Sequence, residues 1–266
     1  MGLHFEERKV RSADGTSIGF VTFGSGPSLV LVHGSASTAD AWLPVATLMA
    51  GQFTCHVIDR RGRGRSGDAR EHSLDRECED IEAVLAGAGS GAHLLGHSYG
   101  GICALEAARR FPLGRLVLYE PPLFHSGSKS EELSVQIRSA MKRNQADEAL
   151  ACFLSSGPEL STAEVSAFRA TPLWQEAVKL APTFAREVEA INRLKSDLKP
   201  YREVSMPTLL LVGTASAAHL KDASSGLQDT LPDVRTIRLE GQSHIANLLA
   251  PDLVAREVSD FLLASA

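Results

Sequence analysis

Residues 92–101 read AHLLGHSYGG, and their residue types point to one particular arrangement of strand, turn and helix. A short apolar run leads into a G-x-S-x-G pattern centred on Ser98, and residues 99–111 then follow with a helical pattern that Pro112 ends. Small residues on either side of the serine, Gly96 and Gly100, let a strand and the next helix approach each other. The stretch therefore predicts a sharp strand-to-helix turn that exposes the Ser98 hydroxyl and aims the first helical amides at a reacting centre.

Other short apolar runs, rich in valine, leucine and isoleucine, alternate with helical patterns along the chain. Such runs are typical of strands buried on both faces of a mostly parallel sheet. Near the N-terminus, two runs flank Asp14-Gly15, a dipeptide suited to a hairpin turn, and predict an antiparallel edge. The sequence therefore predicts an α/β fold with a mostly parallel eight-stranded sheet flanked by helices. The predicted strands span residues 8–12, 17–23, 28–32, 54–59, 92–96, 115–119, 208–212 and 234–239, and two predicted flanking helices span 74–85 and 245–262.

The pattern changes between residues 121 and 200, where no strand candidate occurs and amphipathic segments follow one another. Ser161 and Glu164 match a capping box at the start of one segment. Ligands of open α/β sheets bind beyond the carboxyl ends of the strands. We therefore expect residues 121–200 to form a helical lid, or cap, inserted late in a core made of residues 1–120 and 201–266. A separate helical domain is the alternative.

Composition excludes several classes of protein. Of 266 residues, 44% are hydrophobic and 22% charged, which allows a sizeable core and lies outside the range of disordered chains. The 27 Lys and Arg against 32 Asp and Glu give a net charge of −5, which argues against a nucleic-acid partner. No apolar run is long enough to span a membrane and no signal-peptide pattern opens the chain, so we expect a cytoplasmic protein. The cysteines form no C-x-x-C pair and are expected to be buried free thiols: Cys55, Cys78, Cys103 and Cys152.

An ordered set of motifs resembles the α/β-hydrolase family along almost the whole chain. The set consists of His33-Gly34, the run DRRGRGRS at residues 59–66, the stretch GHSYGG at residues 96–101 and the late His244. It is similar to the lid-bearing branch of the family. That branch includes esterases, lactonases, carbon–carbon bond hydrolases, cofactor-free perhydrolases and some lyases.

The resemblance implies roles for four residues. Ser98 is the nucleophile, and His244, which follows the last predicted strand and Gly241, is the base that exchanges a proton with it. The loop that contains the His-Gly pair supplies one backbone amide of an oxyanion hole, from Ser35, and Tyr99 supplies the other. Only the backbone of these two residues is required, so their side chains are given no role.

The acid that orients the histidine departs from the commonest family pattern. That pattern places an aspartate in the loop after residues 208–212, but here Ser216 occupies the position, and a hydroxyl cannot stabilise an imidazolium as a carboxylate does. Some members of the family keep their acid after the preceding strand, where this chain has Glu120. We expect Glu120 to be the acid, with Asp222 as the alternative. Asp59 is expected to brace the arginine–glycine run.

Three further features have both a structural and a functional interpretation. The arginines of residues 59–66 suggest a phosphate site, but the run lacks the G-K-[ST] of a P-loop and is interpreted as structural. His93 and His97 are spaced like metal ligands but lie on a strand and a turn, so we predict no metal site. Aromatic residues of the insertion can line a pocket or pack in a core, and the same holds for Trp42. The aromatic residues are Phe153, Phe168, Trp174 and Phe184.

Together these residues predict a cofactor-independent serine hydrolase that cleaves an ester or lactone through an acyl-enzyme. Its predicted partner is a small, largely apolar carbonyl substrate. The alternatives are carbon–carbon bond hydrolysis, perhydrolysis and lyase chemistry, which reuse the same turn. A third hypothesis is a non-catalytic binding protein on a decayed hydrolase fold, suggested only by Ser216 at the usual acid position.

Overall fold

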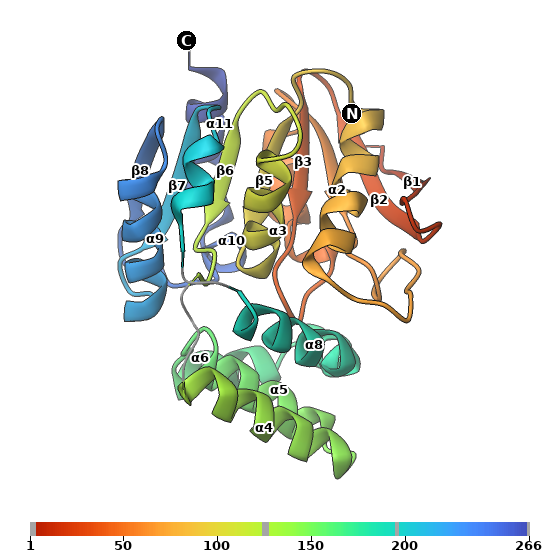
Figure 1. The fold of residues 1–266 in the computed structure, drawn as a ribbon, viewed down its shortest axis with the longest axis vertical. Coiled ribbons are helices and arrows are strands. Elements are labelled where there is room, and N and C mark those ends of the chain that lie inside the picture. Colours follow the sequence, from red (N-terminus) through yellow and green to blue (C-terminus); the bar gives the residue numbers. More distant parts are fainter. Residues whose placement is uncertain (1–3, 124–127, 195–196, 265–266) are drawn as a thin grey trace.

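A mostly parallel sheet forms the centre of the molecule (Figure 1). The computed structural model describes residues 4–123, 128–194 and 197–264. Eight strands follow the order β1-β2-β4-β3-β5-β6-β7-β8, in which only the β1–β2 and β2–β4 pairs are antiparallel. The predicted α/β fold with its antiparallel edge is therefore confirmed. The strands are β1 (Glu6–Arg11), β2 (Ser17–Gly24), β3 (Ser28–Val32), β4 (Thr54–Ile58), β5 (His93–His97), β6 (Leu116–Tyr119), β7 (Thr208–Gly213) and β8 (Val234–Leu239).

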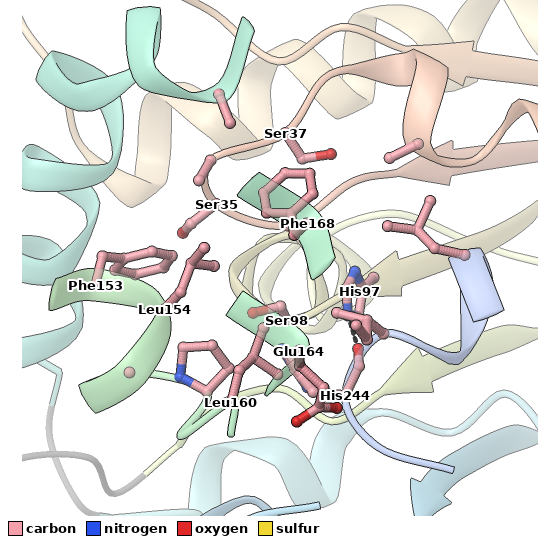
Figure 2. A pocket seen from close by; sticks show the side chains of 18 of the residues that line it. Ser35, Ser37, His97, Ser98, Phe153, Leu154, Leu160, Glu164, Phe168 and His244 are labelled. Atoms are coloured by element: carbon pink, nitrogen blue, oxygen red, sulfur yellow. Dashed lines mark hydrogen bonds between the residues drawn. The ribbon is translucent and has the colours of Figure 1, made fainter. Parts of the chain in front are cut away.

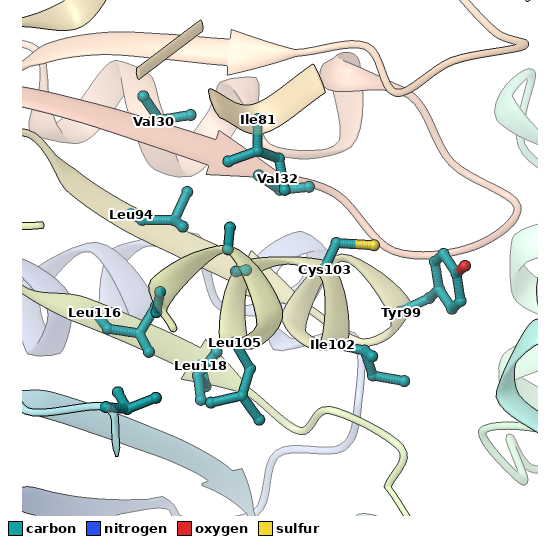
Figure 3. Close-up of a cluster of buried hydrophobic side chains, with 14 of the residues drawn as sticks. Val30, Val32, Ile81, Leu94, Tyr99, Ile102, Cys103, Leu105, Leu116 and Leu118 are labelled. Carbon is teal, nitrogen blue, oxygen red and sulfur yellow. The ribbon is translucent and has the colours of Figure 1, made fainter. Parts of the chain in front are cut away.

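Helices and apolar side chains cover both faces of the sheet, because successive residues of a strand point to opposite sides. In β3, Val30 and Val32 join a core beneath α2, α3 and α9, while Leu29 and Leu31 join another beneath α1 and α11. Figure 3 shows the first of these cores. Burial on both faces explains why central strands such as β3, β6 and β7 appear in the sequence as nearly continuous apolar runs. The flanking helices are α1 (Leu43–Met49), α2 (Leu74–Ala88), α3 (Tyr99–Ala108), α9 (Ala218–Thr230), α10 (Ala246–Leu249) and α11 (Pro251–Leu263), with short 3-10 helices at Ala39–Ala41 and Lys199–Glu203.

The prediction of one continuous helix over residues 245–262 is wrong. The structure has two helices, α10 and α11, separated at Ala250. Pro251 has no N–H with which to continue α10, and a proline disfavours the helical conformation in the residue before it. Ala250 accordingly has φ −142° and ψ 55°. The break leaves α10 as a short helix that begins two residues after His244.

Helices α4 to α8 lie between β6 and β7 in the sequence and beyond one end of the sheet in space (Figure 1). We call them the inserted helices. They share a hydrophobic core of their own, which includes Phe153 and Trp174. The predicted capping box is confirmed at α6, where the side chains of Ser161 and Glu164 each accept a hydrogen bond from the backbone N–H of the other residue. The inserted helices are α4 (Ser128–Lys142), α5 (Ala146–Ser156), α6 (Thr162–Arg169), α7 (Leu173–Lys179) and α8 (Ala181–Asn192).

The cysteines and the helix lengths bear on what the sequence predicts about the surroundings of the protein. Three of the four cysteines are buried free thiols, whereas Cys152 is only half-buried. Burial raises the pKa of Cys55 to about 12, so this thiol stays protonated near neutral pH. Among the helices of the described residues, none combines the length and the apolar character needed to cross a membrane.

Candidate active site

Ser98 lies on the predicted turn, between the last residue of β5 and the first residue of α3. Its φ of 54° and ψ of −126° fall in a region that side-chain-bearing residues rarely adopt, at a cost of about 1–3 kcal/mol. Hydrogen bonds hold this conformation: the Ser98 N–H donates to the Tyr119 carbonyl at 2.9 Å, and the Ser98 carbonyl accepts from Gly101 at 2.8 Å. The strained turn leaves the Ser98 side chain half-buried at the edge of a cavity.

The glycines of the turn are required by close backbone contacts, as the sequence predicts. A Cβ atom on Gly96 would lie 2.4 Å from the carbonyl oxygen of Gly100, and one on Gly100 would lie 2.3 Å from that of His33. A Cβ on Gly34 would lie 2.9 Å from the Cβ of Ser98. The strand, the helix and the His-Gly loop therefore meet at distances that only glycine permits.

His244 and Glu120 form a hydrogen bond across 124 residues of sequence, with 2.7 Å between His244 Nδ1 and Glu120 Oε2. Glu120 directly follows β6, is fully buried and also accepts the Gly213 N–H at 2.7 Å through Oε1. Because a carboxylate can only accept, Nδ1 of His244 carries the proton, and in the neutral ring Nε2 is left as an acceptor. His244 and Ser98 line the same cavity (Figure 2). The arrangement places an oriented imidazole beside an accessible hydroxyl.

His97 and Tyr119 support the loop that carries His244. His97 Nε2 donates to the His244 carbonyl oxygen at 2.9 Å, and the two imidazole centroids are 4.7 Å apart (Figure 2). The Tyr119 hydroxyl donates to the Ser243 carbonyl and accepts from the Ala246 N–H at 3.1 Å. Burial, together with the nearby His244, holds the pKa of His97 well below its usual range, so His97 remains neutral. His244 therefore sits in a loop that is fixed on both sides.

The alternative acids lie elsewhere. Asp222 is exposed on α9, whereas Asp59 accepts the Ala39 N–H at 2.8 Å and the Arg65 N–H at 2.9 Å, which is the bracing role expected for it. Ser216 follows β7 and is buried, and its Oγ has no hydrogen-bond partner among the described residues. Of the carboxylates considered from the sequence, the structure brings Glu120 to the imidazole.

The two backbone amides expected in the oxyanion hole flank Ser98 from two elements. Tyr99 is the first residue of α3, so its N–H has no acceptor within the helix. Ser35 lies in the loop after β3 and lines the cavity. Its N–H donates no hydrogen bond to another described residue. The Tyr99 side chain is buried in the core beside α3 and points away from the sheet strands (Figure 3).

The cavity above Ser98 has a volume of about 700 Å³ and lies between the sheet edge and the inserted helices. Phe153 and Phe168 line it (Figure 2), whereas Trp174 and Phe184 are buried in the core of the inserted helices. Trp42 is also buried, with its ring centroid 5.7 Å from that of His97. Trp42, Trp174 and Phe184 therefore pack in cores, Phe168 lines the cavity, and Phe153 does both.

The charged groups of the cavity wall are carboxylates. Asp40, Glu164 and Glu176 line the cavity, and no lysine or arginine does so in the part of the chain that the structure describes. Over the same residues, no group of three or more His, Cys, Asp or Glu side chains is placed to hold a metal ion. A ligand of this cavity would meet apolar surface and negative charge.

The arginine–glycine run is a set of buried ion pairs, as its structural interpretation predicts. Arg61 pairs with Asp80 at 2.7 Å, and Arg60 pairs with Glu77 at 2.6 Å and with Glu187 of α8 at 2.8 Å. Sequence reasoning missed Glu187. Its position on α8, three residues after Phe184 on the apolar face, is the signal that could have identified a buried carboxylate.

Comparisons with known proteins agree with the fold and the motifs. A family model described as "Alpha/beta hydrolase family" matches residues 29–257. The 2-(acetamidomethylene)succinate hydrolase of Mesorhizobium japonicum is 23% identical, and the match covers 97% of this chain and 96% of that enzyme. The pimeloyl-[acyl-carrier protein] methyl ester esterase of Aeromonas hydrophila is 25% identical, and the match covers 92% of this chain and 99% of that enzyme. The crystal structure of an alpha/beta hydrolase from Sphaerobacter thermophilus matches with a TM-score of 0.84 and 32% identity, over 96% of this chain and 99% of that one. The chain therefore belongs to the alpha/beta hydrolase family.

Proposed function

We propose that this hydrolase cleaves a carboxylic ester or lactone through an acyl-enzyme, with Ser98 as nucleophile, His244 as base and Glu120 as the orienting acid. The observation that carries the proposal is the 2.7 Å contact between His244 Nδ1 and the buried Glu120 carboxylate, at the cavity that Ser98 lines. Nucleophile, base and orienting group are the three parts that serine catalysis requires.

In the proposed reaction, Ser98 Oγ attacks the substrate carbonyl while His244 Nε2 takes its proton. The imidazolium that forms is stabilised by Glu120, which has no competing solvent contact because it is fully buried. The oxyanion is held by the N–H groups of Ser35 and Tyr99, each worth about 2.7–4 kcal/mol in comparable sites. His244 then protonates the leaving alcohol. In the second half of the reaction, a water molecule attacks the acyl-enzyme carbonyl while His244 takes its proton. His244 returns a proton to Ser98 Oγ as the carboxylic acid leaves.

The inserted helices act as a lid in this proposal. Leu154, Leu160 and Phe168, from α5, the α5–α6 loop and α6, line the cavity opposite Ser98. Such a cover excludes water from the reacting carbonyl and strengthens the electrostatic contacts inside the site. It also gives the acyl group of the substrate an apolar surface to pack against.

A substrate-charge preference follows from the composition of the cavity wall. We expect kcat/KM for 4-nitrophenyl hexanoate to exceed that for the mono-4-nitrophenyl ester of adipic acid by at least about tenfold, or about 1.4 kcal/mol. The two esters have the same number of carbon atoms, but the second would bring a carboxylate into a cavity with acidic and apolar walls. Steady-state kinetics on both esters at two salt concentrations measure the ratio. Equal rates, or a preference for the adipate ester, would contradict a neutral substrate class.

The function itself is tested with a fluorophosphonate probe and an activated-ester assay on one preparation. We expect the probe to label the protein at Ser98, mapped by peptide mass spectrometry, and to abolish ester turnover in proportion to labelling. Absence of labelling would favour a non-catalytic binding protein. Faster turnover of vinylogous diketones, or peroxide-dependent halogenation faster than ester cleavage, would show that the reaction class is wrong.

A further inference from the structure

A buried polar network joins the inserted helices to the arginine–glycine run, and the proposed reaction does not use it. Arg60 lies at its centre and is 1% exposed. Its Nη2 donates to Glu77 Oε1 at 2.6 Å and to Glu187 Oε1 at 2.8 Å, and its Nε donates to Glu77 Oε2 at 3.1 Å. Glu187 comes from α8, 127 residues further along the chain, and also accepts from Arg63.

Arg60 also reaches the loop that precedes Ser35. Its Nη1 donates to the Gly34 carbonyl oxygen at 3.2 Å, and its backbone N–H donates to His33 Nε2 at 3.1 Å. Because His33 Nε2 accepts, Nδ1 carries the proton and donates to the same Gly34 carbonyl at 2.8 Å. Burial, followed by the charges of Arg63 and Arg60, holds the pKa of His33 well below its usual range, so the His33 ring stays neutral with its proton on Nδ1. The Gly34 carbonyl is therefore fixed by two donors.

That carbonyl belongs to the same peptide unit as the Ser35 N–H. A peptide unit is planar and trans, so its N–H points opposite to its carbonyl, and fixing one fixes the direction of the other. Donors at the carbonyl also polarise the N–H and make it a better donor. The contacts of Arg60 and His33 thus orient the Ser35 N–H so that it points away from these two side chains.

Arg60 also contacts Tyr99, and Glu187 of α8 holds Arg60 in place. Glu187 is fully buried and pairs with Arg60 and Arg63; although burial raises the pKa of Glu187, the charges of Arg60 and Arg63 lower it below its usual value. On the other side, the Arg60 guanidinium carbon lies 4.6 Å from the centroid of the Tyr99 ring. The ion pair between Arg60 and Glu187 therefore links α8 to the Gly34–Ser35 peptide unit and to the Tyr99 side chain.

We propose that Arg60 and Glu187 are positioning residues for the oxyanion hole, so that the docking of α8 on the core sets the direction of the Ser35 N–H. This inference rests on the proposed function. It gives the inserted helices a second role, because they would complete the machinery for the tetrahedral intermediate in addition to covering the cavity. Neither Arg60 nor Glu187 is among the described residues that line the cavity above Ser98.

Two substitutions test the proposal, and a third on the same helix is the control. Glu187→Gln removes the charge that holds Arg60, and Arg60→Lys keeps a positive charge but removes the Nη1 donor to the Gly34 carbonyl. Arg186→Gln removes a different link between α8 and the core, the hydrogen bonds from Arg186 to Asp68 at 2.9 Å and to the Arg61 carbonyl at 3.4 Å, none of which involves Gly34 or Ser35. Circular dichroism melting curves establish that each variant is folded.

The readouts are kcat, KM and the rate constant for fluorophosphonate labelling of Ser98. We expect Glu187→Gln and Arg60→Lys to lower kcat and the labelling rate about tenfold with KM within about twofold, while Arg186→Gln keeps all three within about twofold. A trifluoromethyl ketone, which resembles the tetrahedral intermediate, should lose affinity by the same factor as kcat/KM. Because both substitutions act through the same contact of Arg60 with the Gly34 carbonyl, the double variant should be no slower than the slower single variant.

The outcomes separate this proposal from the one on which it rests. A wild-type protein that is not labelled at Ser98 would reject the proposed function before any variant is compared. With a labelled wild type, unchanged kcat in both variants would overturn the positioning role. Equal losses in Glu187→Gln and Arg186→Gln would overturn it too, because they would show that any loosening of α8 has the same effect. If Glu187→Gln does not fold, the kcat and the ketone affinity of Arg60→Lys test the positioning role instead.

Discussion

Replacing Ser98 with alanine is expected to lower kcat for an activated ester by about 10⁴-fold or more. The hydroxyl is the only atom group removed, and without it no acyl-enzyme can form. The residual rate would come from the oxyanion hole and from binding of the substrate beside His244. Since alanine and serine both carry a Cβ, the strain at φ 54° is the same in the variant, and we expect an unchanged melting temperature. Fixed-time assays with concentrated enzyme measure the residual rate.

The matched control for this variant is Ser216→Ala. Ser216 is a buried serine at another strand end, and its hydroxyl has no hydrogen-bond partner among the described residues, so its loss should leave kcat within about twofold. Undiminished turnover in Ser98→Ala would remove Ser98 as nucleophile. A comparable loss in both variants would instead indicate damage to the fold near the carboxyl end of the sheet.

Most of the sheet could be predicted from the sequence because its central strands are buried on both faces. Val30 and Leu31 face opposite cores, so β3 is apolar at every position after Ser28 and is recognisable as a strand without knowledge of its neighbours. The turn at Ser98 was predictable for a similar reason, since the contacts that require Gly96 involve residues only a few positions away. Features determined by local sequence could therefore be predicted.

Contacts between segments that are distant in the sequence could be predicted only in part. Glu120 could be named as the acid because strand order brings the ends of neighbouring strands together, but the choice between Glu120 and Asp222 depends on where each side chain points. The pairing of Arg60 with Glu187 joins positions 127 residues apart on separate elements, and no local pattern determines it. Likewise, the burial of Trp174 and the cavity position of Phe168 depend on how the inserted helices pack together.

The substitution Glu120→Gln is expected to lower kcat by about 10³- to 10⁴-fold. Its amide is neutral and cannot stabilise the imidazolium that forms as His244 takes the proton of Ser98. The amide nitrogen can also donate to Nδ1, which would place the ring proton on Nε2, where the base must accept. The fold should be retained because glutamine has the same shape and its oxygen can still accept the Gly213 N–H. We expect KM to change little, since Glu120 is fully buried beneath the cavity.

The control for this variant is Asp222→Asn, which removes the same charge from the exposed face of α9. We expect it to keep kcat within about twofold, because an exposed carboxylate without a contact to His244 contributes little to transition-state stabilisation. Fluorophosphonate labelling should slow in Glu120→Gln and stay fast in Asp222→Asn, which separates a loss of nucleophile activation from a loss of substrate binding. A larger effect of Asp222→Asn on either rate would contradict the assignment of Glu120, because the acid would then have to come from α9.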